Sequence, residues 1–177
     1  APPGEMPGMA GQPDGRFVHS IDPIIGTLGG VHLWWYGFVY VAGAPVVIRV
    51  ASLVDDRPFP TLFWLVDPAL CYRIDQLEAA GLIKQLQQRI NADTDLQRSM
   101  RNDHLAHIAL RDRCMPSLIR LRLQELGFAE ALVNKGIGGI ADFSRIRCLH
   151  TWYGAHLVVP NTVGGLLDDW WCQHTDG

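Results

Sequence analysis

Apolar residues recur at intervals of three and four between residues 68 and 90, a spacing that predicts amphipathic helix. Asp67-Pro68 is typical of a helix start, with an N-cap residue followed by proline at the first helical position. Gly81 indicates a break or a helix end within this run. The apolar positions are Leu70, Ile74, Leu77, Leu82, Leu86 and Ile90.

The same reasoning predicts further helices in the second half of the chain. Proline and capping residues mark their starts, and glycine marks the end of one of them. The predicted bounds are Asp93 or Thr94 to Cys114, Pro116 to Gly127, Asp142 or Ser144 to Val158, and Asn161 to Trp171.

Two short runs are typical of strands. VVIRV, at residues 46–50, is rich in β-branched side chains, and LFWLV, at 62–66, follows a turn-like segment. Residues 23–48 carry no Asp, Glu, Lys or Arg, which meets the length test for a membrane-spanning helix. Repeated glycines and Pro45 interrupt that segment, so we expect short strands there and do not favour membrane contact.

These elements predict an α+β fold, which is a helix-rich single domain with a small two- to three-stranded sheet. Strands and helices do not alternate in the way that βαβ units require. Residues 1–22 are rich in proline and glycine and predict an extended N-terminal tail. The domain is expected over 23–172, and a short C-terminal tail over 173–177.

Composition narrows the classes of function. Hydrophobic residues make up 48% of the 177, which excludes a generally disordered chain. The net charge is −3, so we expect no nucleic-acid partner. Four widely spaced cysteines without a Cys-x-x-Cys pair indicate free thiols in a reducing compartment.

Histidines and cysteines supply candidate metal ligands. His104 and His107 share one face of a predicted helix with Arg111. A further ligand for a single zinc or iron ion would come from Cys148, His150 or His156. Cys148 and His150 lie about 200° apart on a helix, so they can share an ion only where the backbone is not helical. The alternative is that these are polar groups tied to backbone partners.

Two other kinds of site are also open. Cys148 is a candidate nucleophile with His150 as its base, although buried cysteines are more often packed. The loop formed by Gly136, Gly138 and Gly139 offers backbone amides to an anion, and Arg111 lies on a locally basic stretch. A tight chain reversal and a solvated helix face are the competing interpretations.

Six tryptophans are many for this length, and four of them form two adjacent pairs. The pairs are Trp34-Trp35 and Trp170-Trp171. Adjacent aromatic side chains cannot easily all face one small core. They are candidates for a protein interface, where tryptophan is enriched, with ordinary packing as the alternative.

Several segments resemble a known family when read in order. These are GAPVVIRVASLVDDRPFPTLFWLVDPAL, IDQLEAAGLIKQL, KGIGGIADFSRIRCLH, YGAHL and NTVGG. The series is similar to the bacterial domain-of-unknown-function family 501, from about Gly43 to Gly165. That resemblance implies a shared fold and brings no established reaction.

Departures from the family pattern bear on the candidate site. Asp67 stands where the resemblance leads us to expect cysteine, and Trp152 and Ala155 stand where it leads us to expect histidines. Thr162 replaces an expected proline. If those side chains form a site in relatives, this chain has lost ligands, although Asp67 can supply an oxygen.

The expected function is therefore a non-catalytic accessory subunit that binds other proteins in a larger assembly. The alternative is a small metal- or thiol-dependent enzyme, such as a hydrolase of an anionic substrate, that uses the Cys/His residues. Because the chain begins at Ala1, we expect processing. The expected location is a bacterial cytoplasm or, in a eukaryote, a mitochondrion or chloroplast.

Overall fold

The computed structural model describes residues 24–28, 31–34, 38–41 and 44–174, with side chains described from Pro45 onward. The predicted tail at 1–22, Trp35 and the last three residues lie outside this part. The strands are β1 (Ile24–Leu28), β2 (Val31–Trp34), β3 (Phe38–Val41), β4 (Ala44–Arg49), β5 (Leu53–Val54), β6 (Arg57–Pro58) and β7 (Phe63–Leu65). The helices are α1 (Pro68–Ala79), α2 (Leu82–Ala92), α3 (Thr94–Cys114), α4 (Ser117–Glu125), the 3-10 turn η1 (Ile137–Gly139), α5 (Leu149–His156) and α6 (Thr162–His174).

The main sheet is antiparallel, with the strand order β3-β4-β7. In its register Val47 pairs with Leu65 and Ile48 with Trp64. Phe63 is buried and the next residue, Trp64, is exposed, as the alternating sides of a half-covered sheet require. The predicted strands at 46–50 and 62–66 thus pair with each other. β1 pairs with β2, and β5 with β6, in separate two-stranded ribbons.

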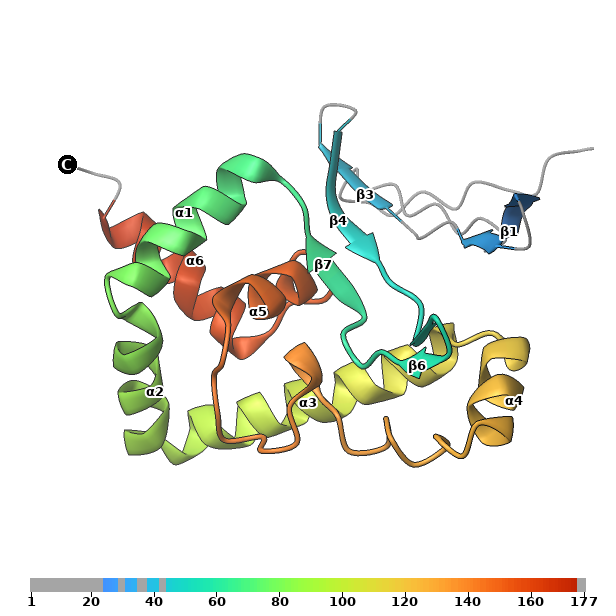
Figure 1. Ribbon diagram of the computed structural model, residues 1–177. Coiled ribbons are helices and arrows are strands. Elements are labelled where there is room, and N and C mark those ends of the chain that lie inside the picture. The colour runs from blue at the N-terminus through green and yellow to red at the C-terminus, as the bar shows by residue number, and fades with distance from the viewer. Residues whose placement is uncertain (1–23, 29–30, 35–37, 42–43, 175–177) are drawn as a thin grey trace, which may run out of the picture.

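Helix α5 occupies the centre of the molecule and packs against β7, α1 and α6 (Figure 1). Gly154 allows this close packing, since a Cβ atom there would lie 3.0 Å from the backbone nitrogen of Leu65. The α1, α2, α3 and α6 helices surround α5 and close one core. Its most deeply buried apolar side chains are Val47, Ile74, Ile90, Met100, Leu149, Trp152, Val163 and Leu167.

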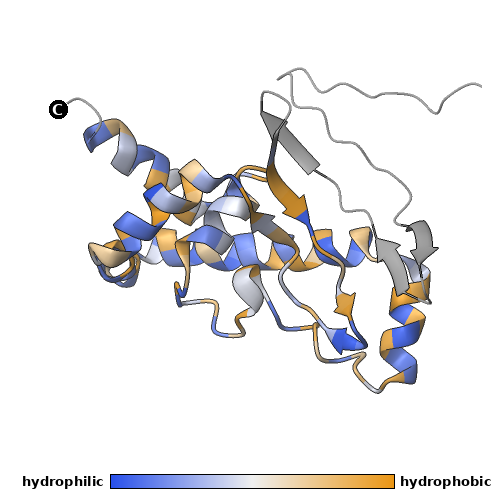
Figure 2. Cartoon of the chain, turned by 45° about the horizontal axis from the view of Figure 1, so that its top comes forward, coloured by the Kyte–Doolittle hydropathy of each residue, from blue (hydrophilic) through white to orange (hydrophobic). Residues whose placement is uncertain are grey.

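A second, smaller core lies under α4. Ile119 and Leu123 point inward from this helix and pack with Leu53 and Leu132. Hydrophobic and hydrophilic residues are mixed around α4, as Figure 2 shows by colour. The small core anchors the β5–β6 ribbon to the chain segment that follows α4.

The predicted α+β class is confirmed, and so are helices near the predicted positions 67–92, 93–114 and 116–127. Asp67 and Asp93 act as the expected N-caps, accepting hydrogen bonds from Leu70 N and Leu96 N. Among the described residues, no helix is long and apolar enough to cross a bilayer. The described parts of 23–48 form strands. The domain limits at 22 and 172 stay a prediction.

One predicted helix start is wrong. The helix expected from Asp142 or Ser144 begins only at Leu149. The Asp142 carboxylate accepts hydrogen bonds from the backbone and the hydroxyl of Ser144, which closes a local turn. Such turns compete with helix formation. The side chain of Gln87, in α2, then accepts a hydrogen bond from the Ile146 N–H. At the other end of the chain, α6 extends past Trp171 to His174.

Candidate functional site

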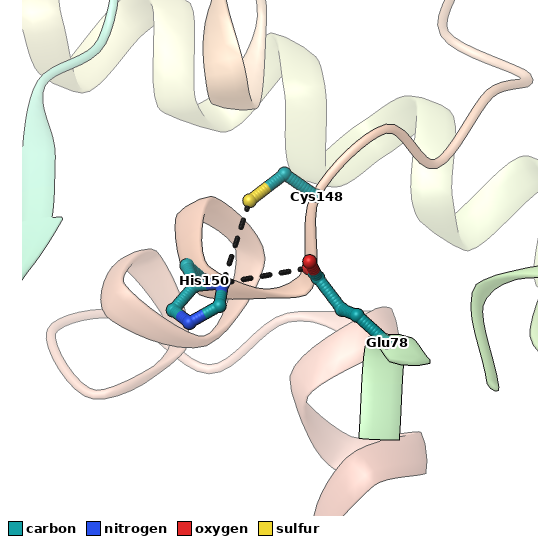
Figure 3. A group of neighbouring side chains, drawn as sticks. All are labelled: Glu78, Cys148 and His150. Carbon is teal, nitrogen blue, oxygen red and sulfur yellow. Dashed lines mark hydrogen bonds and ion pairs between the residues drawn. The ribbon is translucent and has the colours of Figure 1, made fainter. Parts of the chain in front are cut away.

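Glu78, Cys148 and His150 form a group of potential metal ligands, each offering one atom within 4.8 Å of the other two (Figure 3). Nδ1 of His150 lies 3.6 Å from Sγ of Cys148 and 3.4 Å from Oε1 of Glu78. Cys148 is the N-cap residue of α5 and has an extended backbone, with φ −153° and ψ 124°. The sequence condition for Cys148 and His150 to share an ion, a non-helical backbone, is therefore met.

Further contacts fix the orientation of this group. Nε2 of His150 lies 3.2 Å from the carbonyl oxygen of Cys71 and 3.4 Å from Oδ1 of Asp75. The Leu149 N–H donates to Oε1 of Glu78, so this carboxylate from the last turn of α1 caps the start of α5. Glu78 and His150 are about three-quarters buried, whereas Asp75 is mostly exposed.

The Cys148 thiol is not activated as a nucleophile. Burial raises the pKa of Cys148, and the nearby Glu78 carboxylate raises it further. Cys71 is similar, since burial and the charge of Asp75 raise its pKa. A reactive cysteine needs the opposite shift, because the thiolate is the nucleophile. This arrangement argues against thiol catalysis by Cys148 with His150 as base.

His104 and His107 are buried on α3, outside the Glu78–Cys148–His150 group. Nδ1 of His104 accepts a hydrogen bond from the backbone of Ile137 at 3.0 Å, and its ring stacks on Phe143. His107 lies edge-on to Phe63. Burial lowers the pKa of His104 to about 4 and that of His107 to about 3. Both are neutral at pH 7, and the Nε2 atoms of both have no hydrogen-bond partner among the described residues.

These two histidines should make stability fall as the pH falls. Their folded pKa values lie below the ordinary value of 6.5, so below that pH the unfolded chain binds protons that the folded chain does not. Each contributes a slope of up to about 1.4 kcal/mol per pH unit. His107→Leu removes one group and should reduce the slope of unfolding free energy between about pH 6 and pH 4.5. Urea unfolding across this range checks the prediction, which an unchanged slope would contradict.

Arg111 is fully buried, and its hydrogen bonds hold segments of the fold together. Its guanidinium donates hydrogen bonds to the carbonyl oxygens of Pro60, Leu132 and Lys135. It therefore ties α3 to the segment before β7 and to the segment that leads into the glycine loop. These bonds use both terminal nitrogens of the guanidinium, which the sequence analysis gave as a candidate anion-binding group.

The glycine loop at 136–139 is a tight reversal packed against the core. Gly139 N–H donates to the Gly136 carbonyl, and Gly136 N–H donates to that of Ile140. A Cβ atom on Gly136 would lie 2.3 Å from Nδ1 of His104, and one on Gly138 would lie 2.7 Å from the Thr151 hydroxyl. The amides of Gly136, Ile137 and Gly139 are thus used internally, and this packing favours the structural interpretation of the loop.

His156 belongs to a separate hydrogen-bonded group. Its Nδ1 accepts from the Asn161 N–H at 3.0 Å, so Nε2 carries the proton that is donated to Asp168. Tyr153 donates to the other carboxylate oxygen of Asp168. Both ring nitrogens of His156 are therefore occupied, and Asp67 is occupied as the cap of α1. Neither residue joins the group around Cys148.

The two tryptophan pairs fall in different places. Trp171 packs edge-on against Tyr153 and under the guanidinium of Arg73. Trp170 stacks on His174 at 4.0 Å between ring centroids. Both are half-buried and pack against the main core. The Trp34 backbone lies in β2, and Trp35 is outside the described residues.

Sequence reasoning missed Glu78 and Asp168. Glu78 reaches Cys148 and His150 only because α1 packs beside α5, and Asp168 meets His156 through the packing of α6 on α5. Nothing in local spacing marks the role of Glu78. The i, i+12 separation of His156 and Asp168 likewise has no local signature.

The structure thus defines a helix-rich α+β domain with a small antiparallel sheet and a Glu–Cys–His group where α1 meets α5. The sequence profile of the family described as "Protein of unknown function (DUF501)" matches residues 38–169. The chain belongs to this family, as its resemblance over about Gly43 to Gly165 led us to expect. Comparisons with curated proteins and with solved structures found no match.

Proposed function

We propose that this domain acts as a non-catalytic accessory subunit that binds another protein through the outer face of α4. The observation that carries the proposal is that α4 is apolar on two opposite sides. Ile119 and Leu123 are buried in the small core, whereas Leu118 is 61% exposed and Leu121 is 56% exposed.

The geometry of an α-helix makes this arrangement unusual for a surface helix. At about 100° per residue, the outward pair lies roughly opposite the inward pair. A surface helix normally has a polar outer face, and a helix that is hydrophobic all round is normally buried. Phe128 and Val133, in the segment that follows α4, are exposed as well. We call Leu118 and Leu121 the outer α4 face.

The polar groups of the core support a non-catalytic role. His104, Arg111 and His156 bond to backbone atoms or to a carboxylate, and these contacts hold segments of the fold together. The free thiols at all four cysteines are compatible with the proposed reducing compartment. The proposed partner is a protein with an apolar docking element, because Leu118 and Leu121 carry no polar atoms in their side chains.

Replacing both leucines of the outer α4 face with serine should release the partner without unfolding the chain. Exposed side chains contribute little to folding, so the change in stability should be within about 0.5 kcal/mol. Leucine burial in an interface contributes about 1.5–3 kcal/mol per side chain, so the pair should weaken binding by at least about 100-fold. The measurement is the mass of the native complex isolated from source cells.

Tyr72→Ser is the matched control. Tyr72 is 63% exposed on α1, away from α4, and its loss should leave the complex intact. Equal complex formation by the Leu118/Leu121 variant and by the unaltered chain would overturn the assignment of this face.

A further inference from the structure

We propose that Glu78, Cys148 and His150 bind one zinc ion where the end of α1 meets the start of α5. The three ligands are Oε1 of Glu78, Sγ of Cys148 and Nδ1 of His150. This inference does not depend on the protein-binding role of α4, which lies in a different part of the fold.

The ligand chemistry and spacing match zinc. Thiolate sulfur, imidazole nitrogen and carboxylate oxygen are the three donors that zinc takes from proteins. Ordinary bond lengths around a tetrahedral zinc place sulfur and nitrogen about 3.5 Å apart, and nitrogen and oxygen about 3.3 Å apart. The separations here are 3.6 Å for Cys148 to His150 and 3.4 Å for His150 to Glu78. Two edges of the tetrahedron are therefore already formed.

The histidine is oriented as a ligand. Its Nε2 faces the Cys71 carbonyl at 3.2 Å, which favours a proton on Nε2 and a free lone pair on Nδ1. Zinc-bound histidines usually donate their second N–H to a carbonyl or a carboxylate in this way. In that tautomer, the Nδ1 lone pair and the Glu78 carboxylate face each other at 3.4 Å as two acceptors. A cation between them, or a proton on His150 or on the Cys148 thiol, makes this contact favourable.

The extra proton is the competing explanation. A doubly protonated His150 would form ion pairs with Glu78 on one side and Asp75 on the other. That arrangement uses both carboxylates and leaves the Cys148 thiol as a weak hydrogen-bond partner of His150. Zinc accounts for all three members of the group, because binding replaces the thiol proton and releases it to solvent.

The site is held by the fold rather than by a flexible loop. The Leu149 N–H donates to the Glu78 carboxylate and fixes it. Cys148 and His150 are the residues on either side of Leu149. Three protein ligands leave one position of the tetrahedron for a water molecule. The ion would cross-link two helices whose ligands are about 70 positions apart in the sequence, and should therefore raise the melting temperature of the chain.

The test is zinc binding by the purified full-length chain after removal of metal by a chelator. We expect one zinc per chain, measured by elemental analysis after dialysis. Cys148→Ser and Glu78→Gln should each lower zinc affinity, the cysteine change by more than about 100-fold. Cys71→Ser is the matched control, because Cys71 contributes its backbone carbonyl and should keep full affinity. Asp75→Asn removes a longer contact to Nε2 of His150 and should lower zinc affinity by less than Cys148→Ser does.

X-ray absorption at the zinc edge of the unaltered protein gives a second test that does not depend on the folding of any variant. We expect one sulfur and two or three nitrogen or oxygen neighbours. A first shell without sulfur, fewer than one zinc per chain at saturation, or equal affinity in Cys148→Ser would each overturn the proposal. A melting temperature that drops in Asp75→Asn and does not respond to zinc would assign the group to a protonated histidine instead.

Discussion

Replacing Arg111 with methionine is expected to destabilise the folded chain by about 3–5 kcal/mol, a large part of the stability of an ordinary domain. Methionine fills similar space but donates no hydrogen bond. The carbonyl oxygens of Pro60 and Lys135 would lose this donor, and that of Leu132 would keep only its bond from the Lys135 N–H. Each buried polar group left unpaired costs about 1–3 kcal/mol. Because these acceptors belong to the backbone, no change of side chain at their own positions can remove them.

Arg113→Met is the control for this change. Arg113 lies two residues along α3, is exposed, and is chemically identical. Its replacement should alter the free energy of unfolding by no more than about 0.5 kcal/mol. Denaturant unfolding of both variants measures the difference. Similar losses in the two variants would mean that Arg111 does not hold the segments around residues 60 and 132–135 to α3.

Gly164→Ala is expected to be the second most damaging change, with a loss of about 3 kcal/mol. A Cβ atom at this position would lie 2.1 Å from Cγ of the His156 ring. That ring cannot move freely, because Asn161 and Asp168 hold its two nitrogens. The added methyl group therefore displaces α6 from α5 or breaks this hydrogen-bonded group.

The neighbouring glycine supplies an internal control. Gly165 lies in the same helix, and a Cβ atom there would have no neighbour within 4 Å in the part of the chain that the structure describes. Alanine is a better helix former than glycine, so Gly165→Ala should stabilise the chain by up to about 1 kcal/mol. Thermal unfolding of the two variants should give shifts of opposite sign. A neutral Gly164→Ala would show that α6 does not approach His156 so closely.

The helices could be predicted from sequence where their signals are local. Asp67-Pro68 and Asp93 mark starts through side chains that cap their own helix, so the first turns of α1 and α3 follow from neighbouring residues. The start of α5 could not be predicted in this way. It depends on the turn at Asp142 and on two side chains from other helices. Gln87 accepts a hydrogen bond from the segment before α5, and Glu78 accepts one from the first N–H of α5.

The candidate site was predictable only in part. Cys148 and His150 stand out as neighbouring donors in the sequence, and the extended backbone of Cys148 lets both reach one point. Glu78 joins them through the packing of α1 beside α5, which no local pattern encodes. The two histidines on α3 show the opposite case, in which a suggestive spacing does not form a site. His104 and His107 have helical spacing suited to a metal, yet both face the core.

The native mass of this chain in an untreated extract of its source cells tests the protein-binding role most directly. The proposal predicts a defined complex in which the 19.7 kDa chain is present at a fixed ratio to another polypeptide. It also predicts that serine at both Leu118 and Leu121 returns the chain to its own mass. A free, unaltered chain at cellular concentrations would contradict the proposal, and so would a variant that stays in the complex after both substitutions.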